Sequence, residues 1–191
     1  MSTDWMQTRK GTKFEILKPT PEMFDLEEIA SSLGRMCRFN GHTIAPYTVA
    51  QHSVLTWLIC GKKEPWALFH DIAEAYIGDI IRPVRRNLGH TIDDIEFDIL
   101  RAFAERFNLP YTIPSVVWRG DNVALATEAR DIMADPPDDW MLQEFPSEHY
   151  RATPETYFGQ WSDVFLTSAE QALGITIPRT LKSDALGLYQ L

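Results

Sequence analysis

Apolar positions along most of this chain recur at the spacing of helices. Ile29, Leu33 and Met36 fall at positions i, i+4 and i+7 behind an acidic turn, which predicts a first helix with one apolar face. Thr48 and Gln51 stand in the register of a capping box, which predicts that a second helix starts at Thr48. The first third of the chain is therefore expected to be mainly helical.

The same spacing continues towards the C-terminus. Further helices are expected over residues 64–78, 93–107, 114–135 and 153–174, and the tail beyond them has weak periodicity. Residues 78–89 and the acidic stretch around Pro136-Pro137 are predicted to be loops. Residues 1–18 alternate instead, and they predict a short N-terminal strand or hairpin.

Together these elements predict an all-α fold, a helical bundle of about six or more helices. With 191 residues the chain is long enough to bury one core, so residues 1–191 are expected to form a single domain. The six tryptophans are spread along the chain, and most of them are expected to lie in that core.

Composition limits where the protein acts. Hydrophobic residues make up 45% of the chain and charged residues 24%, as in ordinary soluble proteins. No apolar window approaches the ~18 residues of a membrane span, and residues 1–6 lack the pattern of a signal peptide. Cys37 and Cys60 have neither metal-type nor redox-type spacing, so free thiols are expected. We therefore expect a cytoplasmic protein with no membrane partner.

The net charge of −9 indicates that the partner is not a nucleic-acid polymer, because binding to a phosphate backbone usually requires a basic surface. A small anionic substrate remains compatible with this charge, since a site can be locally positive. Two local basic clusters flank the candidate site residues in sequence: Arg35 with Arg38, and Arg82 with Arg85 and Arg86.

The chemistry of the chain is concentrated around His70 and Asp71, which are adjacent in an apolar segment that also carries Glu74. Spacings of three and four residues on a helix place Glu74 near both of them. With His52 upstream and Asp121 downstream, these side chains form a mixed nitrogen and oxygen set suited to a divalent cation.

Structural explanations compete with the metal hypothesis. His70 can be a core histidine bonded to Asp71, and Asp121 can be a surface acid paired to Arg119 or Arg130. His52 can be an ordinary residue at the start of its helix. Against this, Asp121, Asn122 and Glu128 interrupt a segment whose neighbours look buried, and a buried carboxylate requires a cation or another partner.

His52, the pair His70-Asp71 and Asp121 resemble the H…HD…D signature of the HD-domain phosphohydrolases. The resemblance includes Cys37-Arg38-Phe39, residues 48–53, residues 69–80 and Pro83-Val84-Arg85, and it covers about residues 25–133. These segments look like those of the bacterial 5′-deoxynucleotidases and their phage relatives, including the deoxyadenosine triphosphate triphosphohydrolases. The resemblance implies an HD-domain helical bundle.

By this resemblance His52, His70, Asp71 and Asp121 bind one divalent metal, which is Zn²⁺, Co²⁺, Mn²⁺ or Mg²⁺. Glu74 matches the carboxylate that activates water, and Asp79 matches a loop carboxylate near sugar and phosphate; a second metal near these two is an open alternative. The implied substrate-binding residues are Arg35, Arg38, Phe39, Ser53, Arg82, Arg85 and Arg86. Phe39 stands where the cellular enzymes usually carry a tryptophan.

The function implied by the resemblance is metal-dependent cleavage of the 5′ phosphate ester of deoxynucleotides, with a small-molecule substrate. A dedicated dATP triphosphohydrolase, an enzyme acting on a signalling nucleotide and an inactive nucleotide-binding module remain as alternatives. The signalling type usually has Glu-Asp soon after the His-Asp pair, and Asp79-Ile80 does not supply that dipeptide. Relatives in the family form homo-oligomers, and the apolar last helix is a candidate interface.

Overall fold

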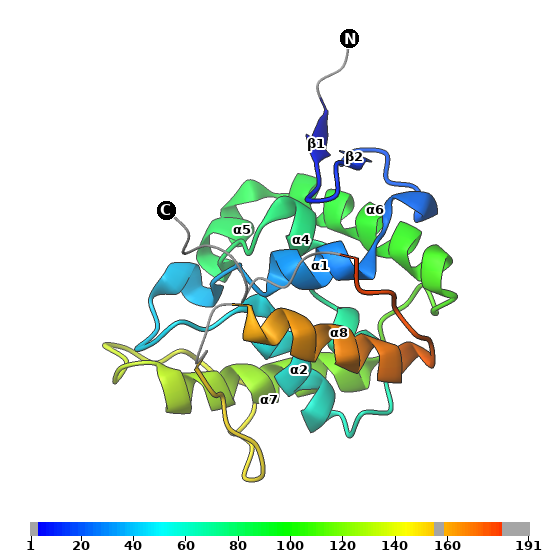
Figure 1. Ribbon diagram of the computed structural model, residues 1–191. Coiled ribbons are helices and arrows are strands. Elements are labelled where there is room, and N and C mark those ends of the chain that lie inside the picture. Colours follow the sequence, from blue (N-terminus) through cyan, green and yellow to red (C-terminus); the bar gives the residue numbers. More distant parts are fainter. Residues whose placement is uncertain (1–3, 155–158, 181–191) are drawn as a thin grey trace, which may run out of the picture.

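The computed structural model describes residues 4–154 and 159–180 of the chain. Over these residues the protein is mostly helical, with one short hairpin near the N-terminus (Figure 1). The strands are β1 (Trp5–Gln7) and β2 (Lys13–Glu15), and the 3₁₀ turns are η1 (Pro21–Met23) and η2 (Arg38–Gly41). The helices are α1 (Leu26–Leu33), α2 (Val49–Ile59), α3 (Trp66–Phe69), α4 (Glu74–Ile77), α5 (Arg82–Leu88), α6 (His90–Phe107), α7 (Ser115–Ile132) and α8 (Gln160–Leu173).

The all-α prediction and the N-terminal hairpin are confirmed, and α6 and α7 occupy the segments expected for them. The last helix, predicted over residues 153–174, is present as α8 from Gln160, and Thr153 and Pro154 are not helical. Residues 155–158 and the tail from residue 181 lie outside the described residues. Local capping explains the two N-terminal helices. The Asp25 carboxylate accepts the Glu27 and Glu28 amides at the start of α1, at 2.9 and 3.1 Å. At α2 the predicted capping box between Thr48 and Gln51 is present.

Helix α2 is the centre of the molecule. Every residue from Val49 to Trp57 is buried, because α2 packs against α3, α7 and α8. Helix α8 crosses α2 and also packs on α1, with Phe165, Leu166 and Ala169 buried in these contacts (Figure 1). These buried residues of α8 are thus covered within the chain, and the homo-oligomer expected from the sequence stays a prediction.

The predicted helix over residues 64–78 is wrong in one respect, because it divides into α3 and α4. Between them the backbone is wound more tightly, with i→i+3 hydrogen bonds from Glu74 N to Asp71 O and from Ala75 N to Ile72 O, both 3.1 Å. This winding changes which side chains share a face. His70 and Asp71 lie in the turn between the two helices, where neighbouring side chains can approach one point.

The predicted loop over residues 78–89 is also wrong, because Arg82–Leu88 form α5. Pro83 lies in the first turn of α5, where its missing N–H leaves no helical hydrogen bond unmade. Gly78 and Gly89 flank the helix at φ of 85° and 73°, conformations that side chains rarely adopt. The two glycines therefore allow a short helix in a connection that was predicted to be a loop from its composition.

Among the described helices, none combines the length and the apolar character needed to span a membrane.

Candidate metal centre

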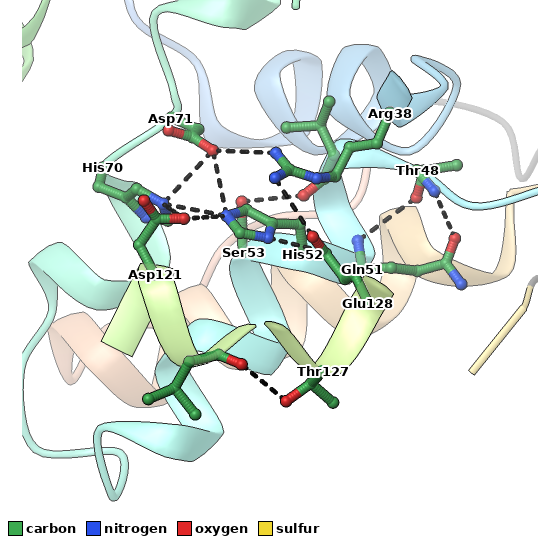
Figure 2. A network of polar contacts seen from close by, with 12 residues as sticks. Arg38, Thr48, Gln51, His52, Ser53, His70, Asp71, Asp121, Thr127 and Glu128 are labelled. Atoms are coloured by element: carbon green, nitrogen blue, oxygen red, sulfur yellow. Dashed lines mark hydrogen bonds and ion pairs between the residues drawn. The ribbon is translucent and has the colours of Figure 1, made fainter. Parts of the chain in front are cut away.

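Four side chains from three parts of the fold converge beside α2 (Figure 2). His52 comes from α2, His70 and Asp71 from the turn after α3, and Asp121 from α7. The Nε2 atoms of the two histidines lie 3.3 Å apart. Asp121 Oδ1 lies 3.1 Å from His52 Nε2 and 4.0 Å from His70 Nε2, and Asp71 Oδ2 lies 3.4 and 3.3 Å from the same two nitrogens.

Hydrogen bonds at the Nδ1 atoms of His52 and His70 determine the tautomer of each ring, and therefore whether its Nε2 atom faces the centre with a lone pair or a hydrogen. His52 Nδ1 lies 2.7 Å from the Glu128 carboxylate, and His70 Nδ1 lies 3.2 Å from the Ala67 carbonyl. Both partners are acceptors, so each Nδ1 carries the hydrogen. In the neutral rings both Nε2 lone pairs then face each other and the two aspartates. Four acceptors gathered without a hydrogen between them require a cation or a proton.

The spacing of the four atoms suits a metal ion. Ligands about 2.1 Å from a common ion lie about 3.0 Å apart at adjacent octahedral positions and about 3.4 Å apart in a tetrahedron. Most separations in the centre fall in that interval, and His52, His70 and Asp121 form a group that can hold a metal. Imidazole with carboxylate is a donor set typical of zinc and other transition metals. The residues present therefore fit the metal that the sequence predicted.

The carboxylates around the centre determine the pKa of His52. Burial and the Arg38 guanidinium lower this pKa, but the carboxylates of Glu128 and Asp121 outweigh them and raise it to about 9. Burial likewise opposes the charge of Asp121, yet the hydrogen bond and charge of His52 lower the Asp121 pKa. Without metal, a proton on His52 thus takes the place of the cation.

Arg38 links the two sides of the centre. Its guanidinium lies 3.6 Å from Asp71 Oδ2 and 3.3 Å from Glu128 Oε2, with dashed lines to both in Figure 2. Burial opposes the charges of Arg38 and Glu128, but their mutual attraction raises the pKa of the arginine and lowers that of the glutamate. Glu128 is completely buried and contacts both His52 and Arg38. Glu128 therefore holds His52 and Arg38 in place from the buried side of the centre.

The centre opens on its carboxylate side. Both histidines are buried, whereas the side chains of Asp71 and Asp121 keep 18% and 17% of their surface exposed. Arg82 reaches this open side from α5, with its guanidinium 3.6 Å from Asp121 Oδ2. A ligand therefore reaches the centre past two carboxylates and one exposed arginine.

Glu74 and Asp79 interact electrostatically with the centre, since the charges of Asp71 and Arg38 act on both carboxyl groups. Burial raises the pKa of Glu74 well above its usual range, and the charges of Asp71 and Asp79 raise it further. One Glu74 oxygen, Oε2, is buried without a hydrogen-bond partner among the described residues. Burial also raises the pKa of Asp79, whose carboxylate accepts a hydrogen bond from the backbone of Phe39. A buried carboxylate with a raised pKa is a strong base, which suits Glu74 to accept a proton.

Three of the predicted substrate-binding residues lie elsewhere or are occupied. Ser53 is fully buried and its hydroxyl donates to Val49 O at 3.0 Å within α2. Arg35 is exposed and lines a separate cavity of about 350 Å³ between the hairpin and α1. Arg85 is bound by Asp93 and Glu96 of α6. These contacts do not place the three side chains at the metal centre.

The remaining predicted residues are Arg86, which is exposed on α5, and Phe39, which follows Arg38 at the edge of the centre. The competing explanation for Asp121 is wrong, because Arg119 pairs with Glu144 and Arg130 with Asp131. Asp121 instead contacts the two histidines and Arg82.

No functional role was predicted from the sequence for Glu128 or Trp140. Glu128 follows Asp121 by seven residues on α7, which is two helical turns, so both carboxylates lie on one face. That spacing was a usable signal for a second acid directed at the same histidine. Trp140 lies in the irregular segment after α7, with its ring 6.1 Å from that of Phe39. With 37% of its surface exposed, Trp140 lies outside the core in which most tryptophans were expected, as do Trp5 and Trp118.

Comparison with known proteins gives relatives but no activity. No protein-family model matches the chain. An uncharacterized protein of Rhodobacter capsulatus is 31% identical over 140 residues, which cover 68% of this chain and 71% of that protein. The Escherichia coli protein YfdR, also described as uncharacterized, is 34% identical over 141 residues, which cover 73% of this chain and 79% of YfdR.

Proposed function

We propose that this chain, which belongs to the same family as these two bacterial proteins, is a metal-dependent phosphohydrolase that cleaves the 5′ phosphate ester of deoxynucleotides. The observation that carries the proposal is the set of four facing acceptor atoms from His52, His70, Asp71 and Asp121. The resemblance of these residues to the HD-domain phosphohydrolases supplies the substrate class.

The two histidines and two aspartates would hold the cation. When bound, a divalent metal polarises a phosphoryl oxygen and makes water a stronger nucleophile near neutral pH. The protein contributes the orientation of its ligands. Glu128 and the Ala67 carbonyl hold His52 and His70 in the tautomers whose Nε2 lone pairs point inward.

Glu74 is the proposed general base. It is close enough to Asp71 and Arg38 for their charges to act on it, and its raised pKa makes it a better proton acceptor than an exposed carboxylate. Water adds to the α-phosphorus as Glu74 takes its proton, the bond from phosphorus to the 5′ oxygen breaks, and the departing 5′ oxygen takes up a proton from solvent. The products are a deoxynucleoside and phosphate, or a longer phosphate chain.

The arginines oppose the charge of the transferring group. Arg38 is fixed between Asp71 and Glu128, so its positive charge is already oriented before substrate arrives. Arg82 is 56% exposed beside Asp121, where an anionic ligand would meet it first. This exposed cation favours a second candidate, release of triphosphate from dATP, because a longer phosphate chain would extend towards α5.

The test is an assay of metal-loaded protein with Mn²⁺ or Co²⁺ on deoxynucleoside mono- and triphosphates and on ribonucleotides. Phosphorus NMR separates phosphate from triphosphate, and chromatography identifies the nucleoside. We expect deoxynucleoside release that His70→Ala abolishes and that His90→Gln, in an exposed histidine of α6, leaves intact. A wild-type protein that binds metal and turns over none of these substrates would contradict the proposal.

A further inference from the structure

Phe39 and Asn40 both adopt a left-handed backbone conformation, which asparagine tolerates but which is unusual for a bulky residue such as phenylalanine. Their φ angles are 53° and 51°, in the left-handed region that bulky side chains rarely enter. The hydrogen bond from the Phe39 amide to Asp79 and the 2.9 Å bond from His42 N to Phe39 O hold the segment in place. Backbone strain of this kind is concentrated at functional sites, where it fixes the direction of a side chain.

The Phe39 ring contacts both Arg38 of the metal centre and Trp140. The Arg38 guanidinium lies 5.3 Å from the centroid of the Phe39 ring, within the range of a cation–π contact. The Phe39 ring also lies 6.1 Å from the Trp140 ring, with 48° between the planes. Asp71, Arg38, Phe39 and Trp140 therefore form a continuous path outward from the metal centre.

Trp140 is poorly explained by packing alone. Its indole is 37% exposed in an acidic segment that has no helix or strand, and the neighbouring Met141 is 77% exposed. An indole is the largest flat π surface that a side chain offers, and every nucleobase has a π face that stacks on it. Placed one phenyl ring away from a phosphate-binding arginine, it lies where a mononucleotide carries its base.

We propose that Trp140, with Phe39, forms the aromatic platform on which the base of the nucleotide stacks. This inference rests on the proposed function for the position of the phosphate, and it deepens it by assigning the base-binding residue. The stacking area favours purines, whose two rings cover more of the indole than a pyrimidine does. Base preference then resides in the segment after α7, outside the metal ligands.

The experiment compares Trp140→Ala, Trp140→Phe and the matched control Phe145→Ala, which removes an 89% exposed aromatic from the same segment. KM and kcat are measured for dAMP and for deoxyribose 5-phosphate, which lacks a base. We expect Trp140→Ala to raise KM for dAMP by about tenfold, within the ~5- to 150-fold range of a lost base-stacking contact. Trp140→Phe and Phe145→Ala should change this KM by less than about threefold. For deoxyribose 5-phosphate, Trp140→Ala should change neither constant, because that substrate never stacks.

A binding measurement separates this inference from the proposed function. Deoxyadenosine has no phosphate to hydrolyse, so it is titrated into metal-loaded wild type and Trp140→Phe while tryptophan fluorescence is followed. Quenching that is lost in Trp140→Phe supports the platform even if no nucleotide is turned over. Equal quenching in both proteins, or an equal rise in KM for both substrates, would overturn it.

Discussion

Glu128→Gln is the substitution that tests the architecture of the centre most finely. Gln keeps the volume of Glu128 and still offers a carbonyl oxygen to the His52 Nδ1 hydrogen, so the imidazole keeps its tautomer. The substitution removes the negative charge of the carboxylate, whose oxygens lie 2.7 Å from His52 Nδ1 and 3.3 Å from the Arg38 guanidinium. The substitution therefore separates charge from geometry in the support of a metal ligand.

The expected loss has two parts. Removing the carboxylate behind a ligating histidine typically weakens metal binding by about 10- to 100-fold, because the imidazole becomes less basic. Arg38 also loses one of its two acidic partners while remaining buried, which costs about 3 kcal/mol of folding stability. Asp71 still faces Arg38 at 3.6 Å, which holds this cost at the lower end of the usual range.

The assay has to be run at two values of pH, because a proton and the metal compete for His52. With the His52 pKa at about 9, roughly 99% of metal-free wild-type molecules carry the proton at pH 7, which weakens apparent metal affinity by about 100-fold. Glu128→Gln lowers the pKa of His52, so the proton competes less with the metal for this histidine. Near neutral pH this gain offsets part of the loss in intrinsic metal affinity. The loss in affinity should be small at pH 7 and should approach its full size near pH 9.

The assay is a titration with Zn²⁺ buffered by a competing chelator, at pH 7 and at pH 9, with Glu105→Gln on the exposed face of α6 as the matched control. Thermal unfolding of the metal-free proteins reports the stability cost. An affinity for Zn²⁺ that Glu128→Gln leaves unchanged at pH 9 would refute the supporting role of this carboxylate. So would a loss of equal size at both values of pH.

Three further predictions concern the same centre. Glu74→Gln should lower kcat by about 10²- to 10⁴-fold, as for loss of a general base, while Zn²⁺ affinity stays within a few-fold; loss of the metal instead would make Glu74 a ligand. Calorimetry in buffers of different ionisation enthalpy should detect about one proton released per metal bound at pH 7, because the His52 pKa is about 9. Since that pKa is raised above its unfolded value, His52 contributes ~3 kcal/mol to the stability of the metal-free protein below pH 6.5, and this contribution is lost as pH rises to 9. A metal-free protein whose unfolding free energy does not fall over this interval would contradict the predicted His52 pKa.

Local signals predicted much of the fold. The capping box of Thr48 and Gln51 is decided within four residues, and it fixed the start of α2 correctly. The apolar periodicity of α6 and α7 likewise reports burial on one face of each helix. Such signals describe single elements, and they were sufficient for the class of the fold.

The errors came from interactions that periodicity does not report. Composition favoured a loop for Arg82–Leu88, but the two flanking glycines and the contacts of Arg85 with α6 allow a helix there. The turn at residues 70–73 follows i→i+3 bonds that leave the apolar pattern of the segment unchanged. Local pattern therefore missed both the helix in the loop and the break in the helix.

The candidate site was predictable where residue chemistry and spacing coincide. His52, His70 and Asp121 were chosen from the sequence, and the structure brings them within 4.8 Å of one another. Glu128 was noticed as a buried acid, but its bond to His52 joins residues 76 positions apart, which no local pattern specifies. The contact between Phe39 and Trp140 is of the same long-range kind.

The most direct test of the account is the amount of metal bound by the purified protein after it is stripped and reloaded. Elemental analysis and calorimetry on wild type should give one tightly bound divalent cation per chain at the His52 and His70 centre. His70→Ala should abolish that binding while circular dichroism shows the helices retained, and the exposed His90→Gln should leave it intact. A wild-type chain that binds no cation, or one whose cation survives the loss of His70, would contradict the central claim.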